Sequence, residues 1–283
     1  MKQKCFNETQ AIMRKLIRKA VVIFISALFV FAIGCKKDKQ ENPPELPPES
    51  SFLMDFSDFQ ENEDKSFDIL NDYSNYQRAV AHVVVWNLVI SIHLAIPVAT
   101  FTNSFNYTPV YQPDTESWKW TYDVTVNNGT YTANLYGKIF DTYVRWDMYV
   151  SKTGIGAFTD FHWYFGESNL NNTGGEWTLH KNPNEPITFV GIVWNRNIEE
   201  QVFDITYTNI VPGGAENGGY ISYGHTNDTD YNAFYNIYNK GQDNLVEIKW
   251  DRTSKDGRIK DPAFFGDDNF RCWDSTFLNT DCE

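Results

Sequence analysis

The five histidines are the residues of this sequence best suited to bind a metal or to act as a general base. His82 and His93 lie eleven residues apart. On a helix that spacing places both rings on one face but about 16 Å apart along the axis. Two ligands of one ion cannot be so far apart, and the sequence has no His-Glu-x-x-His spacing either.

His162 and His180 are expected on the polar faces of β-strands, with Asp160 beside them. Two imidazoles and a carboxylate that meet across strands could bind a metal or transfer a proton, as a hydrolase requires. The alternative is a solvated strand face without chemistry. Because the chain has no Gly-x-Ser-x-Gly elbow and no phosphate-binding loop, we assign no catalytic residue, no cofactor and no enzyme activity.

Aromatic residues are the one compositional excess, with nine Trp, sixteen Tyr and 21 Phe. Flat rings flanked by polar groups are suited to binding sugars, although tyrosine is also a common strand residue. Four tyrosines are expected among charged residues on the solvent-facing side of strands. Together with His162 and His180 they are the candidate ligand-binding residues: Tyr136, Tyr143, Tyr149 and Tyr164.

The first 34 residues have the pattern of an export signal. Six basic residues precede an apolar run from Ala20 to Ile33, which is too short to favour a membrane-spanning helix. The run ends in Ala32-Ile33-Gly34-Cys35, which resembles the lipobox of bacterial lipoproteins, where the signal is removed before a cysteine that carries diacylglycerol. The resemblance implies lipidation of Cys35 and a membrane-anchored protein. An uncleaved signal anchor is the alternative.

Residues 35–51 follow as a charged and then proline-rich tether with no apolar face to bury. This start resembles lipoproteins of the Bacteroidota type, which implies attachment to the outer membrane on either its periplasmic or its surface face. Removal of residues 1–34 takes away six basic residues and Glu8, which changes the formal net charge from -13 to -18. Such an acidic domain is poorly suited to binding nucleic acid or anionic lipid head groups.

Cys272 and Cys282 remain near the C-terminal end of the sequence and should form a disulfide in an oxidising envelope compartment. Asp267, Asp268 and Asp274 gather around the same loop and are candidate calcium ligands. Their spacing matches no EF-hand, so we assign no metal site.

Residues 52–283 are expected to form a single β-rich domain with one helix near residues 75–101. From Ala79 to Phe101 the sequence has no charged side chain, and a helix that is apolar nearly all round must be wrapped by protein or lipid. Two buried strands are an alternative. A transmembrane helix is another, but His82, Asn87 and His93 would need partners in hydrocarbon.

The rest of the sequence predicts antiparallel β-sheet. Residues 52–59 are a candidate first strand, and from Trp118 apolar and polar residues alternate. Asn128-Gly129 indicates a hairpin, and further turn residues separate about ten strands. We predict a mainly β fold, a curved or half-barrel meander wrapped around one long buried helix. In outline it is similar to the half-barrel lipid and lipoprotein carriers of the bacterial envelope.

A group of short motifs in the second half of the chain resembles a set of uncharacterised Bacteroidota lipoproteins. That resemblance implies the domain boundaries and the envelope location, and no activity. The motifs are Asn217-Gly218-Gly219-Tyr220, Asn239-Lys240-Gly241-Gln242-Asp243-Asn244, Lys260-Asp261-Pro262, Phe265-Gly266-Asp267 and Cys272-Trp273-Asp274.

We therefore expect a membrane-anchored lipoprotein with a non-enzymatic binding or structural role, and the sequence identifies no protein partner. An apolar-ligand carrier would need a cavity of several hundred cubic ångströms between helix and sheet. A surface glycan-binding module would need a row of exposed Tyr and Trp rings. A hydrolase would need His162 or His180 within hydrogen-bond reach of Asp160 or another carboxylate at the floor of a cleft.

Overall fold

The computed structural model describes residues 42–59 and 74–282, and all elements below belong to the unit of residues 43–283. The predicted export signal, Cys35 and the beginning of the tether lie outside the described residues. In the described part of the chain the fold is mainly β, as predicted, and every strand is antiparallel to its neighbours.

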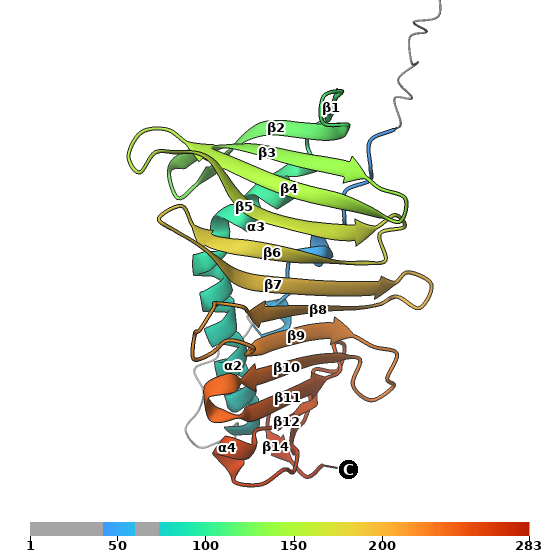
Figure 1. The fold of residues 1–283 in the computed structure, drawn as a ribbon. Helices are drawn as coiled ribbons and strands as arrows, with labels where there is room; N and C mark the ends of the chain where they lie inside the picture. Colours follow the sequence, from blue (N-terminus) through green and yellow to red (C-terminus); the bar gives the residue numbers. More distant parts are fainter. Residues whose placement is uncertain (1–41, 60–73, 283) are drawn as a thin grey trace, which may run out of the picture. The chain divides into compact units, whose positions relative to one another are not determined.

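The described strands form one open sheet in which sequence order is also spatial order, so that it is a meander of fourteen strands rather than about ten (Figure 1). Short turns between successive strands leave antiparallel pairing of neighbours as the simplest arrangement. The strands are β1 (Val110–Gln112), β2 (Ser117–Val126), β3 (Gly129–Ile139), β4 (Tyr143–Lys152), β5 (Phe158–Asn169), β6 (Gly174–Asn182), β7 (Glu185–Asn197), β8 (Val202–Asn209), β9 (Tyr220–His225), β10 (Ala233–Asn239), β11 (Asn244–Trp250), β12 (Gly257–Lys260), β13 (Arg271–Trp273) and β14 (Asn279–Thr280).

Alternation gives the sheet one buried face, which we call the inner face, and one solvent-facing outer face. In β2 the inner face carries Trp118, Trp120, Tyr122 and Val124, all buried as predicted. The β2–β3 hairpin turns at Asn127 and Asn128, whose φ angles of 48° and 62° are left-handed. Asparagine tolerates that region, so the turn lies one residue earlier than Asn128-Gly129.

Two consecutive helices cross the inner face, α2 (Ser74–His93) and α3 (Ala95–Ser104). The chain bends by 74° at the break between them. Pro97 lies in the first turn of α3, where its ring excludes the carbonyl of residue 93 and it has no N–H to donate. Among the described residues no single helix is long and apolar enough to cross a membrane; the bent pair passes that test only when both helices are counted together.

The helices run across the strands rather than along them (Figure 1). At the start of α2, Asn75 donates a hydrogen bond of 2.8 Å to the carbonyl of Cys272 in β13. At its end, the ring of His93 lies 5.3 Å from that of Phe189 in β7. In α3, Thr100 accepts a hydrogen bond from the hydroxyl of Tyr122 in β2. The helix pair therefore connects the C-terminal strands with the N-terminal ones.

The expectation of one long buried helix is wrong. Only one side of α2 is covered, by residues such as Ala79 and Val83, which are 0% and 1% exposed. On the opposite side Val85, Leu88 and Ile92 are 59%, 59% and 63% exposed. The physical reason is the open sheet: it lies against α2 from one direction and does not close around it. The sequence pattern showed that the helix is apolar all round. It did not show how much of the helix surface would be covered by the rest of the protein.

Residues 43–59 also lie on the inner face, and neither the tether boundary at 51 nor a strand at 52–59 is correct. Pro44 and Pro47 are already buried, so the packed unit begins at Pro43. Beyond them the segment is extended, with short 3-10 turns η1 (Glu49–Ser51) and η2 (Ser57–Phe59). Its backbone carbonyls accept hydrogen bonds from hydroxyl groups of the sheet, including 2.7 Å from Tyr207 to Phe52.

Asp261 links α2 to the sheet through hydrogen bonds. It immediately precedes the short helix α4 (Pro262–Phe265). Its side chain is fully buried and accepts hydrogen bonds from Arg78 at 2.7 Å, His82 at 3.0 Å and Asn244 at 2.9 Å. Burial by itself raises the pKa of Asp261, but these hydrogen bonds more than offset it and leave the pKa below its ordinary value. His82 is thus a structural residue, and it does not meet His93.

Candidate functional site

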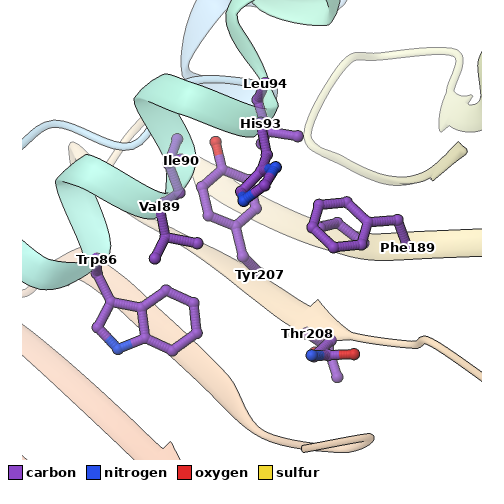
Figure 2. Close-up of a pocket in the computed structure, with 10 residues that line it drawn as sticks. Trp86, Val89, Ile90, His93, Leu94, Phe189, Tyr207 and Thr208 are labelled. Atoms are coloured by element: carbon purple, nitrogen blue, oxygen red, sulfur yellow. The ribbon is translucent and has the colours of Figure 1, made fainter. Parts of the chain in front are cut away.

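A small apolar pocket lies between the C-terminal half of α2 and strands β7 and β8 (Figure 2). Trp86, Ile90 and His93 line it from the helix, and Phe189 and Tyr207 line it from the sheet. Its volume is about 90 Å³. Cavities that bind drug-sized ligands typically measure about 300 to 1,000 Å³, so this pocket has room for a group no larger than about one ring. This pocket by itself does not supply the several hundred cubic ångströms that an apolar-ligand carrier requires.

A larger groove of about 580 Å³ lies on the outer face over β2–β5. It is open to solvent, and its walls combine aromatic, amide and charged side chains. The lining residues are Thr115, Ser117, Lys119, Asn134, Tyr136, Lys138, Arg145, Asp147, Tyr149 and Asp160. We call this the outer groove.

An aromatic row runs from the outer groove across the neighbouring strands. The ring of Tyr136 lies 5.9 Å from that of Tyr149, which stacks at 4.5 Å on His162. His162 in turn lies 5.4 Å from Phe165 and 5.7 Å from His180. Four of these rings come from consecutive strands β3 to β6, one on each, so cross-strand pairing in the antiparallel sheet aligns them. All five side chains are partly exposed.

Charged side chains surround the row and fix its geometry. Asp147 accepts a hydrogen bond of 2.9 Å from His162 and one of 3.2 Å from Arg145, which also pairs with Glu167 at 3.6 Å. Although burial raises the pKa of Asp147, these hydrogen bonds more than offset it and hold the pKa below its ordinary value. Lys119 lies over the ring of Tyr136, with its Nζ 5.2 Å from the ring centre.

Two of the four predicted tyrosines belong to the outer groove, and two do not. Tyr143 lies on the same face but at the start of β4, where it stacks at 4.7 Å on Phe140. Tyr164 is fully buried on the inner face and was wrongly assigned to the polar face. The cause is a β-bulge: Met148 pairs with Tyr164 and Tyr149 with His162, so that Trp163 is an extra residue. Beyond the bulge every side chain changes face, which brings Phe165 to the outer face.

His162 and His180 meet across β5 and β6, as the sequence suggested. His180 donates a hydrogen bond of 2.6 Å from Nδ1 to the backbone carbonyl of His162. Asp160 is not their partner; its backbone N–H binds Ser151, and Asp147 takes its place. The contact between His162 and a carboxylate meets one part of the condition set for a hydrolase, but neither His162 nor His180 is among the residues that line the outer groove. Because Arg145 also holds this carboxylate and aromatic rings lie beside the imidazole, the pair is well suited to a structural role.

Two of the three carboxylates proposed for calcium hold other partners. Asp267 accepts hydrogen bonds from Arg271 and from the backbone of Asn269, and Asp274 caps its own turn through the backbone of Thr276. Asp268 is exposed. Within residues 42–59 and 74–282 no group of three or more metal-binding side chains comes together. Cys272 and Cys282 form the predicted disulfide.

Sequence reasoning missed seven of the ten residues that line the outer groove, among them Lys119, Arg145 and Asp147, and it also missed Phe165 of the row. Arg145 and Asp147 were expected on the same strand face as Tyr143 and Tyr149, so their spacing of two was a usable signal. Phe165 gave no signal because a bulge moved it. Comparison with known proteins adds nothing to this description: no family model, no curated protein and no solved structure matches the chain.

Proposed function

We propose that this chain is a lipid-anchored protein of a bacterial outer membrane that binds a glycan in the outer groove and has no enzyme activity. The anchor rests on the lipobox-like Ala32-Ile33-Gly34-Cys35 directly after the apolar run of an export signal. The evidence for a glycan ligand is the groove itself, in which aromatic rings and hydrogen-bonding side chains lie next to each other on a solvent-open surface.

The single observation that carries the glycan assignment is the pair of Tyr136 and Tyr149 in the outer groove. A sugar ring has an apolar C–H face and a rim of hydroxyl groups. Partly exposed tyrosine rings offer a flat apolar surface for the C–H face. Arg145, Asp147 and Asn134 offer hydrogen-bond donors and acceptors for the hydroxyl groups. The tryptophans contribute nothing to this surface, since eight of the nine are buried on the inner side of the domain.

An apolar ligand is less well supported because the inner pocket is only about 90 Å³. A lipid acyl chain does not fit within it.

The glycan assignment is tested by screening the purified full chain against an array of neutral and anionic oligosaccharides and measuring affinity for any that bind. Replacement of Tyr149 by Ala should weaken binding roughly tenfold or more, since loss of a central aromatic contact costs about 2 kcal/mol. Tyr143→Ala is the matched control, because Tyr143 lies on the same strand and face but is not among the residues that line the groove. An array without a bound sugar, or equal losses in both variants, contradicts the assignment.

The anchor is tested separately by metabolic labelling with a radioactive fatty acid. Wild-type protein should carry the label and sediment with membranes, whereas Cys35→Ala should do neither. Label on the Cys35→Ala variant would refute lipidation at this residue and would leave the glycan assignment untouched.

A further inference from the structure

The exposed side of α2 is an apolar surface that neither the fold nor the proposed glycan site uses. Its apolar side chains are Val84, Val85, Leu88, Val89 and Ile92, between 39% and 63% exposed. At 100° per residue these side chains span an arc of about 140°. Contiguous apolar surface of this kind marks a site of contact with another apolar body.

The helical stretch itself carries no charged side chain beyond its first turns. From Ala79 to Pro113 the sequence contains no Asp, Glu, Lys or Arg, although the chain as a whole has a formal net charge of -13. Acidic residues elsewhere would be repelled by an anionic lipid surface, and this stretch would not. Beside the start of α2, Phe264 is 56% exposed and stacks against Arg78 at 4.3 Å, which places an aromatic ring at the end of the apolar stripe.

The first residues of the packed unit lie on the inner face of the sheet, which is also the face that α2 crosses. Pro44 packs over Gly137, an inner-face residue of β3, where an added Cβ would come within 3.1 Å of the proline ring. Only six residues lie between Cys35 and Asn42, and at full extension the seven steps from one to the other reach about 25 Å. A lipid on Cys35 would thus hold the inner-face side of the domain close to the bilayer, and not at the distance that a tether to residue 51 would allow.

We propose that the exposed face of α2 inserts into the interfacial region of the membrane to which Cys35 is anchored. The helix then lies in the plane of the bilayer surface with Val85, Leu88 and Ile92 among the acyl chains, a second attachment that adds to the lipid. The outer groove is on the opposite face of the sheet and points away from the bilayer toward solvent. This inference rests on the lipid anchor of the proposed function.

The test places one fluorescent probe on the helix of the lipidated protein. Cys35 is blocked by lipid and Cys272 is paired with Cys282, so a cysteine introduced by Val85→Cys is the one free thiol of the mature chain. It is labelled with an environment-sensitive nitrobenzoxadiazole dye, and the protein is reconstituted into vesicles of phosphatidylethanolamine and phosphatidylglycerol. Ile155→Cys, in the β4–β5 loop and 96% exposed, is the matched control.

The dye at residue 85 should shift its emission to shorter wavelength in vesicles and be quenched by lipids with a nitroxide on the acyl chain, and the dye at residue 155 should do neither. An added Leu88→Asp should abolish the shift. Acylated, vesicle-bound protein with a water-like emission at residue 85 overturns the inference and leaves the anchor standing. Absence of acylation at Cys35 overturns both. A shift that persists without vesicles, together with a doubled mass in sedimentation, shows that a second copy covers the helix and also overturns the inference.

Discussion

Two adjacent residues of α2 offer a direct test of its one-sided packing. Val83 is 1% exposed and faces the sheet, whereas Val84 is 47% exposed and faces away. Replacing each in turn by Asp changes the intrinsic helix propensity equally and little, because Val and Asp rank close together. The two variants therefore differ mainly in where the carboxylate is placed.

Val83→Asp should remove most of the stability of the domain. Burial of a valine side chain contributes about 1.5 to 3 kcal/mol, and a carboxylate without a partner in an apolar contact costs several more. The total of about 5 kcal/mol or more is comparable with the 5 to 15 kcal/mol that keep a typical domain folded. Val84→Asp loses only part of a half-exposed side chain and leaves its charge in water, so we expect about 1 kcal/mol or less.

Urea unfolding of the full chain, followed by tryptophan fluorescence, measures both effects. Most tryptophans are buried on the inner side, so their emission reports on the packing that α2 completes. If Val84→Asp unfolded the domain as Val83→Asp does, the helix would be covered on both sides in solution, and the one-sided contact described above would be wrong.

Two further predictions concern buried or half-buried ionisable groups. Asp261→Ala should destabilise the domain by about 3 kcal/mol, because it leaves Arg78 and Asn244 without their partner, whereas the exposed Asp268→Ala should stay within about 0.5 kcal/mol in the same urea assay. Burial and the neighbouring Arg252 lower the pKa of His225 from 6.5 to about 4, so its ring stays neutral in the folded protein between these values while the unfolded chain takes up a proton. The free energy of unfolding is therefore not reduced by His225 above pH 6.5, and it decreases as pH falls from 6.5 toward 4. After allowance for the partial exposure of the ring, this decrease is about 1 to 2 kcal/mol. His225→Gln should lose correspondingly less stability between pH 7 and pH 5, and equal losses in both proteins would contradict the assignment to this ring.

The meander was predictable because it depends on local signals. Alternation in residues such as Trp118 and Trp120 fixes which side of a strand is buried, and turn residues such as Asn128 limit where strands end. The disulfide between Cys272 and Cys282 was predictable for a similar reason, because these are the two cysteines left once the signal and the lipid site are assigned. Each inference needed only residues close together in the sequence.

The outer groove was predictable in part. Tyr136 and Tyr149 were assigned to the correct face because no irregularity interrupts the strands before them. Tyr164 was placed on the wrong face because one extra residue, Trp163, reverses the alternation beyond it. A bulge depends on how β5 pairs with β4, and periodicity along a single strand does not reveal it.

By itself the sequence determined the strand class and order, the apolar character of the helical segment, the pairing of the last two cysteines and the expectation of a lipid anchor. Only the tertiary structure decided that the sheet stays open, that α2 keeps an uncovered apolar side, and that Arg145, Asp147 and His162 come together beside two tyrosines. The physical reason is that secondary structure follows from the spacing of side chains along the chain. How much of a surface is buried, and which residues share a groove, depends on contacts between residues far apart in sequence.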